Sequence, residues 1–98
     1  MTCPSDSTLT YANFGEPFMT EYCTECHSSN LTGDERMGAP LFHDFNTLEG
    51  IMAFTQHIDE TAAAGPKSVN TLMPQFDPKP TLAERYQLGE WLACGTPP

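Results

Sequence analysis

The stretch Cys23-Thr24-Glu25-Cys26-His27 constrains this chain more than any other. It has the pattern C-x-x-C-H, on which haem is attached covalently in proteins. The spacing lets both thiols reach neighbouring vinyl groups from one helical turn, and the adjacent imidazole then lies under the iron. We therefore predict one covalent haem c, with Cys23 and Cys26 in thioether bonds and His27 as an axial ligand of the iron.

Two other kinds of site use cysteines at this spacing. A thioredoxin-like redox pair needs a βαβ setting, and no run of strand-forming residues flanks the motif. A zinc site needs two further ligands, commonly from a second C-x-x-C or from two histidines close in sequence. The remaining cysteines and histidines are isolated from one another, so the sequence favours haem.

The 98 residues are expected to form a single domain, 1–98, in which the polar residues 1–9 are an extended arm. A chain this short buries only about two-thirds of its unfolded surface, so a covalent haem would add a large apolar group to its core. Hydrophobic residues make up 39% of the chain, and the 7 Gly and 9 Pro favour short helices joined by long loops.

The formal net charge of −9 argues against nucleic acid and anionic membrane surfaces as partners. It fits a redox protein partner with a basic docking surface, although acidity that serves only solubility explains it equally well. No apolar run approaches the roughly 20 residues of a membrane span. The expected assembly is a monomer or a weak oligomer.

A periplasmic location is expected, because haem is attached to C-x-x-C-H outside the cytoplasm in bacteria. An export signal would then have preceded this chain, which itself contains no signal-peptide pattern.

The first predicted helix covers Thr10–Cys26, where apolar residues recur at spacings of three and four. These are Tyr11, Phe14, Gly15, Phe18, Met19 and Tyr22. Pro17 interrupts the pattern, but a proline is tolerated in the first turn of a helix. The helix is therefore expected over the whole range or over the shorter range 16–26 after an upstream turn.

The second predicted helix covers Asn46–Ala64, with Asn46 or Thr47 as its N-cap. Apolar residues form one stripe along it, and Gly65-Pro66 ends it. His57 lies off this stripe and is expected to be exposed.

The last predicted helix begins at the capping box Thr81-Leu82-Ala83-Glu84 and closes at Cys94-Gly95. The loop before it, residues 67–80, contains Met73-Pro74. A methionine on a proline-stiffened loop can aim its thioether at a fixed point, and a soft sulfur suits haem iron. We predict Met73 as the second axial ligand, with a methionine that only packs on the core as the alternative.

The loop 28–46 contains candidates for the proximal side of the haem. A metal-bound histidine usually donates its other ring N–H to a carbonyl group, and Pro40 is predicted to provide that carbonyl. Arg36 is a candidate for an ion pair with a haem propionate, with a solvated arginine as the alternative. His43 and His57 are disfavoured as axial ligands.

Cys3 and Cys94 are the two cysteines outside the motif. In an oxidising compartment they are expected to form a disulfide, which would close a loop of almost the whole chain. The alternative is a lipidated Cys3, which would leave Cys94 without a partner.

Residues from about Gly15 to Gly95 resemble class I (mitochondrial-type) cytochromes c in their small bacterial monohaem form. The features that carry the resemblance are C-x-x-C-H, Gly15, Met19, Gly38-Ala39-Pro40, Met73-Pro74 and Trp91-Leu92. In that family a Gly-x-Pro carbonyl accepts from the proximal histidine, and an aromatic residue packs the last helix across the first at the glycine. Pro17 and the pair Cys3 and Cys94 depart from the family pattern.

The resemblance implies an all-α cytochrome c fold, with three main short helices and long loops wrapped around one haem. It also implies a soluble carrier of single electrons, not an enzyme, whose iron is ligated by His27 and Met73. Two other functions remain open. One is a haem-based sensor or peroxidase-like enzyme with a labile sixth ligand, and the other is an electron-transfer subunit of a larger dehydrogenase or oxidase.

Overall fold

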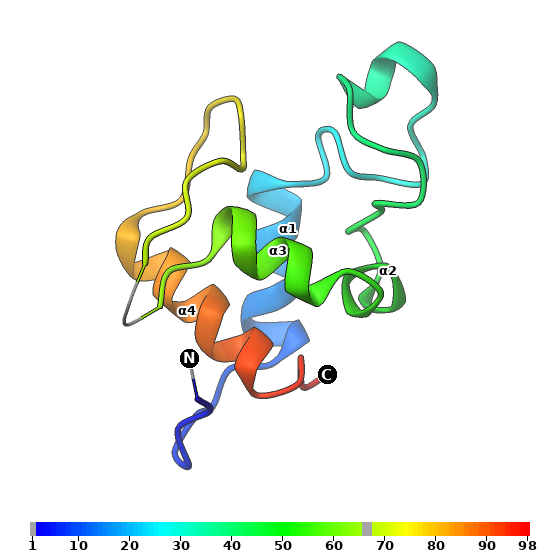
Figure 1. Ribbon diagram of the computed structural model, residues 1–98. Helices are drawn as coiled ribbons and strands as arrows, with labels where there is room; N and C mark the ends of the chain where they lie inside the picture. Colours follow the sequence, from blue (N-terminus) through cyan, green and yellow to red (C-terminus); the bar gives the residue numbers. More distant parts are fainter. Residues whose placement is uncertain (1, 66–67) are drawn as a thin grey trace.

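The computed structural model describes residues 2–65 and 68–98, and its regular structure there is helical (Figure 1). The elements are the π-helix η1 (Tyr11–Gly15), α1 (Glu16–Tyr22), the 3-10 helix η2 (Gly33–Arg36), α2 (Leu48–Met52), α3 (Thr55–Ala62) and α4 (Leu82–Ala93). The only β-pairing in the described part is one isolated bridge, between Ala64 and Val69. The predicted all-α class is therefore confirmed. None of the described helices is long and apolar enough to cross a membrane.

The first predicted helix is present as η1 followed directly by α1. Thr10 caps η1 through its side chain, which accepts a hydrogen bond from the Asn13 N–H at 3.0 Å. Pro17 lies in the first turn of α1, as the sequence predicts. The helix ends at Tyr22 rather than at Cys26, because the chain turns at the C-x-x-C-H motif.

The second predicted helix is broken, so the prediction of one continuous helix over 46–64 is wrong. Thr47 caps α2, as predicted, by accepting a hydrogen bond from the Gly50 N–H at 3.1 Å. At Phe54 the backbone leaves the helical conformation, with φ −134° and ψ 31°, and α3 begins at the next residue. The Phe54 ring packs on His43, with 4.1 Å between ring centroids, so a tertiary contact accompanies the break. Pro66, predicted to end this helix, lies outside the described residues.

The last helix, α4, crosses the segment η1–α1 at a close contact. Trp91 is completely buried, and a Cβ built on Gly15 would lie 2.6 Å from its indole ring. Only a glycine permits this approach. The core around the crossing contains Phe14, Phe18, Met19, Phe45, Ile51, Ile58, Ala62, Ala63, Leu88 and Trp91. The predicted capping box of α4 is confirmed, and Gly95, with φ +84°, follows its C-terminal end.

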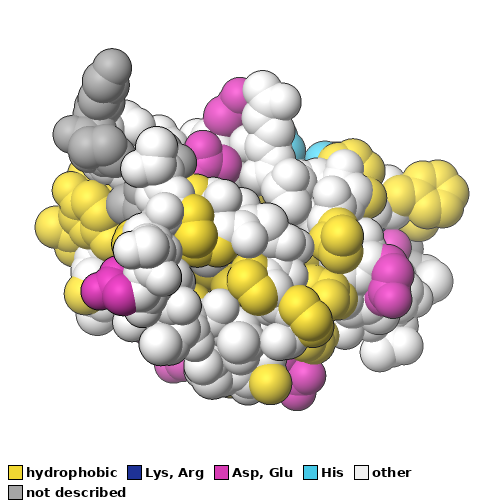
Figure 2. Space-filling model, turned by 90° about the horizontal axis from the view of Figure 1, so that it is seen from below, with side chains coloured by type: hydrophobic (Ala, Val, Ile, Leu, Met, Phe, Trp, Pro, Cys, Tyr) yellow, Lys and Arg dark blue, Asp and Glu magenta, His cyan; other side chains and the backbone are white. Residues whose placement is uncertain are grey.

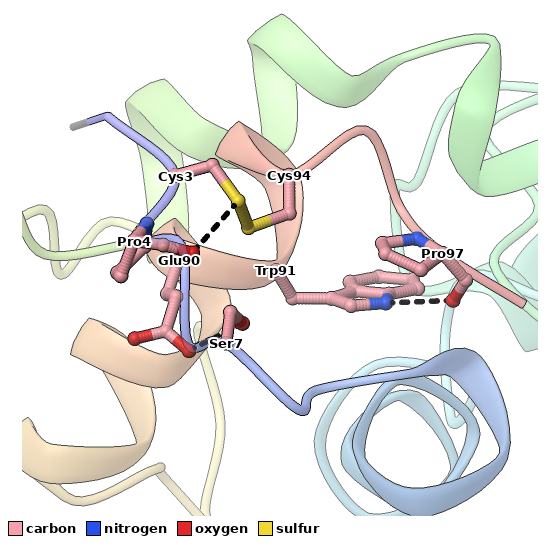
Figure 3. Close-up of a disulfide and its surroundings, with 7 residues drawn as sticks. All are labelled: Cys3, Pro4, Ser7, Glu90, Trp91, Cys94 and Pro97. Atoms are coloured by element: carbon pink, nitrogen blue, oxygen red, sulfur yellow. Dashed lines mark hydrogen bonds between the residues drawn. A yellow bond between two sulfur atoms is a disulfide. The ribbon is translucent and has the colours of Figure 1, made fainter.

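The segments that contain Cys3 and Pro97 both lie beside the C-terminal end of α4 (Figures 1 and 3). The structure pairs Cys3 with Cys94 in a disulfide, as predicted, with Cα atoms 4.8 Å apart. Trp91 donates a hydrogen bond from Nε1 to the Pro97 carbonyl at 3.1 Å. The two long loops after α1 and before α4 extend from the opposite end of the helices (Figure 1).

Candidate haem-binding site

A cavity of about 150 Å³ opens between these two loops. Five site residues predicted from the sequence lie in its wall: Cys23, Cys26, His27, Pro40 and Met73. A smaller cavity of about 30 Å³ adjoins it and shares Cys23, His27 and Met73 as lining residues. The fold thus brings together a C-x-x-C-H motif and a methionine that lie far apart in the sequence.

The two cysteines lie in a turn that continues from α1. The Cys23 N–H donates to the Met19 carbonyl at 2.9 Å, and the His27 N–H donates to the Cys23 carbonyl at 2.9 Å. Both cysteines are free thiols. Burial raises the pKa of Cys23 to about 12, and burial together with Glu25 raises the pKa of Cys26. The thiols are therefore neutral at pH 7, whereas a reactive dithiol pair needs a lowered pKa.

His27 is held in a defined orientation. Its Nδ1 lies 3.0 Å from the His43 carbonyl oxygen, and its ring stacks on Phe45 with centroids 4.6 Å apart. A hydrogen bond from Nδ1–H to that carbonyl fixes the tautomer in which Nε2 is free to ligate a metal. Burial lowers the pKa of His27, which favours the neutral imidazole that a metal ligand needs.

The predicted acceptor for His27 was the wrong residue. The Pro40 carbonyl accepts a hydrogen bond from Arg36 Nη2 at 2.8 Å, and His43 provides the carbonyl that faces His27. The reason is a backbone contact, because the Phe45 N–H donates to the His27 carbonyl at 2.8 Å and thereby brings the segment 43–45 alongside the histidine. Sequence reasoning considered His43 only as an axial ligand.

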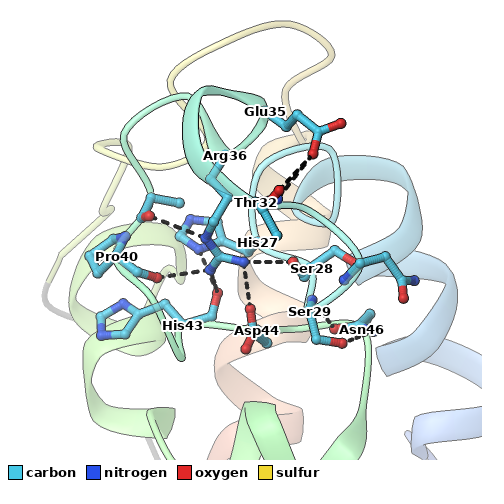
Figure 4. A network of polar contacts seen from close by, with 12 residues as sticks. His27, Ser28, Ser29, Thr32, Glu35, Arg36, Pro40, His43, Asp44 and Asn46 are labelled. Carbon is cyan, nitrogen blue, oxygen red and sulfur yellow. Dashed lines mark hydrogen bonds and ion pairs between the residues drawn. The ribbon is translucent and has the colours of Figure 1, made fainter.

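Arg36 lies inside the loop 28–46 and connects several of its segments (Figure 4). It is 4% exposed and donates hydrogen bonds to the carbonyl groups of Ser28, Ala39, Pro40 and His43. Its guanidinium also forms an ion pair with Asp44 at 2.7 Å. Neither predicted role, a propionate contact or a solvated arginine, describes this residue. By donating to the His43 carbonyl at 3.2 Å, Arg36 acts indirectly on the orientation of His27.

The backbone of Met73 is held in place by two hydrogen bonds. Its N–H donates to the Thr61 carbonyl at 2.9 Å, and its own carbonyl accepts from Arg85 Nη1 at 2.9 Å. The side chain is partly buried and packs against the core. Met73 therefore belongs both to the core and to the wall of the cavity.

Sequence reasoning did not assign to the site several other residues that line the cavity, among them Tyr22, Met37 and Phe76. The Met37 sulfur lies 3.4 Å from Cys26 Sγ. Phe76 is 49% exposed at the rim. Tyr22 stands directly before Cys23, and that adjacency was the only signal that could have identified it.

The donor set fits a covalently attached haem. Two thiols at C-x-x-C spacing, an imidazole with Nδ1 already engaged and a thioether line one cavity. Within the described residues no group of three or more His, Cys, Asp or Glu side chains could hold a metal ion by itself. No family model, curated protein or solved structure matches the chain.

Proposed function

We propose that this protein is a c-type cytochrome that carries single electrons between protein partners. The observation that supports the proposal is the presence of Cys23, Cys26, His27 and Met73 in the wall of one cavity. Haem c, when bound, would supply the one-electron chemistry of iron. The polypeptide would contribute two attachment points, an oriented imidazole and a soft sulfur ligand.

The role of a carrier, rather than an enzyme, rests on the proposed ligand pair. With His27 and Met73 both engaged, no position remains for a substrate. The thioether would favour a higher reduction potential than a second histidine. Cys23 and Cys26, in the wall of the same cavity, would tie the cofactor edge to the turn after α1.

The surface charge supports a basic protein partner. Two of the four basic residues of the chain, Arg36 and Arg85, are only 4% exposed, and Lys79 is the one exposed basic residue in the described part. One face of the molecule shows scattered acidic side chains and no described Lys or Arg (Figure 2). Such a surface would attract a cationic partner to a transient complex. A periplasmic location is proposed with the carrier role, and the disulfide is of the kind that persists in that compartment.

A visible absorption spectrum of protein exported through a haem-attachment system tests the proposal. We expect a sharp α-band in the reduced protein and a weak long-wavelength band in the oxidised protein. The Met73→Ala variant should lose the weak band. The matched control is Met37→Ala, since Met37 lines the same cavity and should leave the band in place.

Other outcomes would replace the proposal. A high-spin spectrum in the unmodified protein would mean an open sixth position and would favour the sensor or peroxidase-like function. Persistence of the weak band in Met73→Ala would exclude Met73 as the ligand. Absence of haem from the exported protein would return Cys23 and Cys26 to the redox or zinc alternatives. Copurification with a second protein at low salt would favour an electron-transfer subunit of a larger dehydrogenase or oxidase, a role that is compatible with electron carriage.

A further inference from the structure

Arg85 connects α4 to the chain that contains Met73. Its Nη1 donates hydrogen bonds to three carbonyl oxygens, at 2.9 Å to Ala62, 3.0 Å to Asn70 and 2.9 Å to Met73. Its own carbonyl accepts a hydrogen bond from the Ala64 N–H at 3.0 Å. One side chain of α4 thus joins the end of α3 to two points of the loop that follows.

The partners of the charged guanidinium group distinguish Arg85 from Arg36. Both side chains are 4% exposed, and Arg36 pairs with Asp44. Within residues 2–65 and 68–98 no carboxylate pairs with Arg85. A buried guanidinium without a counter-ion is costly unless hydrogen bonds compensate for the lost water. The three carbonyl groups provide that compensation, so they and Arg85 stabilise one another in this geometry.

Met73 is consequently held from both sides of its peptide backbone. Its N–H is bonded to Thr61 of α3 and its carbonyl to Arg85 of α4. With both groups engaged, the start of the Met73 side chain has little freedom to move relative to the two helices. Arg85 also lies close enough to Cys23 that its positive charge lowers the pKa of that thiol, against the larger effect of burial.

We propose that Arg85 is a positioning residue that keeps the Met73 thioether at the haem site and so closes the sixth position of the iron to other ligands. This inference rests on the proposed function. Arg85 acts through the Met73 carbonyl, and only Met73 and His27 would serve as ligands. Without it, the loop after α3 would lose a shared anchor, and Met73 would leave the site more often.

Imidazole binding to the oxidised haem protein tests the role of Arg85. An added ligand binds in proportion to the fraction of molecules in which Met73 has left the iron, so Arg85→Met should bind imidazole roughly tenfold more tightly than the unmodified protein. Arg85→Lys keeps a donor that can reach one carbonyl and should give an intermediate affinity.

Leu88→Ala is the control for a general loss of stability, because Leu88 lies on the same helix, is completely buried and takes part in neither hydrogen bond to the Met73 backbone. It should unfold more easily but change imidazole affinity by less than about twofold. Equal affinities in Arg85→Met and Leu88→Ala would overturn the inference. If Arg85→Met does not fold, an imidazole affinity of Arg85→Lys equal to that of the unmodified protein would also overturn it.

Amide hydrogen exchange separates this inference from the proposed function. In the purified chain the Met73 amide should exchange roughly tenfold faster in Arg85→Met, relative to the amides of α1, and this ratio should not change in Leu88→Ala. If the unmodified protein lacks the Met73-dependent band, the proposed function fails, and the exchange ratio still decides whether Arg85 holds the loop. An unchanged ratio would contradict the role of Arg85 even where the band is present.

Discussion

Tyr22, the residue before the first cysteine of the motif, links α1 to α4. Its hydroxyl group donates to the Glu84 carboxylate and lies 2.9 Å from each oxygen. Burial and the Glu84 hydrogen bond raise the pKa of Tyr22 to about 12. The pKa of Glu84 is lowered, first by the hydrogen bond from the Thr81 backbone and also by Tyr22. The link is therefore strongest when the phenol is protonated and the carboxylate is ionised.

The pH dependence of stability tests this link through Tyr22→Phe. Near pH 7 the variant should lose about 1 kcal/mol of unfolding free energy, the size of one hydrogen bond. Because the pKa of Glu84 is lowered from its ordinary value of 4.5, Glu84 stabilises the fold at pH values above 4.5, and this contribution is lost as the pH falls. Because the pKa of Tyr22 is raised from 10.0, Tyr22 stabilises the fold at pH values below 10.0, and this contribution is lost as the pH rises toward about 12.

Urea unfolding of the unmodified protein and of Tyr22→Phe across the pH range gives the difference in unfolding free energy between them. It should be constant between about pH 6 and 9 and should shrink at both ends. A difference that does not vary with pH would show that Tyr22 contributes through packing and not through its bond to Glu84.

Among the elements, the crossing of η1–α1 with α4 determines the arrangement of the helices. Gly15 has no side chain, and the Trp91 ring occupies the space that a Cβ would need. Its backbone φ of −61° is ordinary for any residue. The requirement for glycine is therefore one of space and not of backbone conformation.

Gly15→Ala should accordingly lower the unfolding free energy by about 1–3 kcal/mol, through overpacking against Trp91. Gly65→Ala is the control, since no heavy atom lies within 4 Å of its added Cβ, and its effect should stay within about 0.5 kcal/mol. Thermal unfolding measures both. Equal effects of the two substitutions would contradict the proposed close contact.

At the scale of the whole molecule, the covalent link between the chain ends and the candidate site lie at opposite ends of the helices (Figure 1). The disulfide joins residues 91 positions apart and ties the N-terminal arm to the end of α4. Ser7, on the same arm, donates a hydrogen bond to Glu90 at 2.7 Å (Figure 3). Neither contact involves a residue of the cavity wall.

Replacing both Cys3 and Cys94 with Ser should lower the unfolding free energy by about 2–4 kcal/mol, because the unfolded chain regains the freedom that the long loop had removed. The spectrum of haem bound at the candidate site should stay unchanged. Thermal unfolding and the visible spectrum of the same sample provide both measurements. A changed spectrum would show that the two ends of the molecule are coupled.

Short-range features of the site could be predicted from sequence alone. The thiol and imidazole groups of C-x-x-C-H lie in one turn because their spacing is local. The Thr81 capping box and the place of Pro17 in a first turn are likewise decided within a few residues. The Cys3–Cys94 pair followed from the small number of cysteines. The presence of haem and the ligation by Met73 stay predictions.

Only the tertiary structure decided the contacts between segments that have no periodic pattern. Residues 28–46 form a loop around Arg36, and which carbonyl faces His27 depends on the path of that loop. The break at Phe54 accompanies a contact with His43 that the helical pattern does not encode. The side chains of Arg36 and Arg85 are charged, and only the carbonyl groups that accept their hydrogen bonds explain why they are buried. Local spacing thus specified the chemical groups of the site, and long-range packing determined what surrounds and holds them.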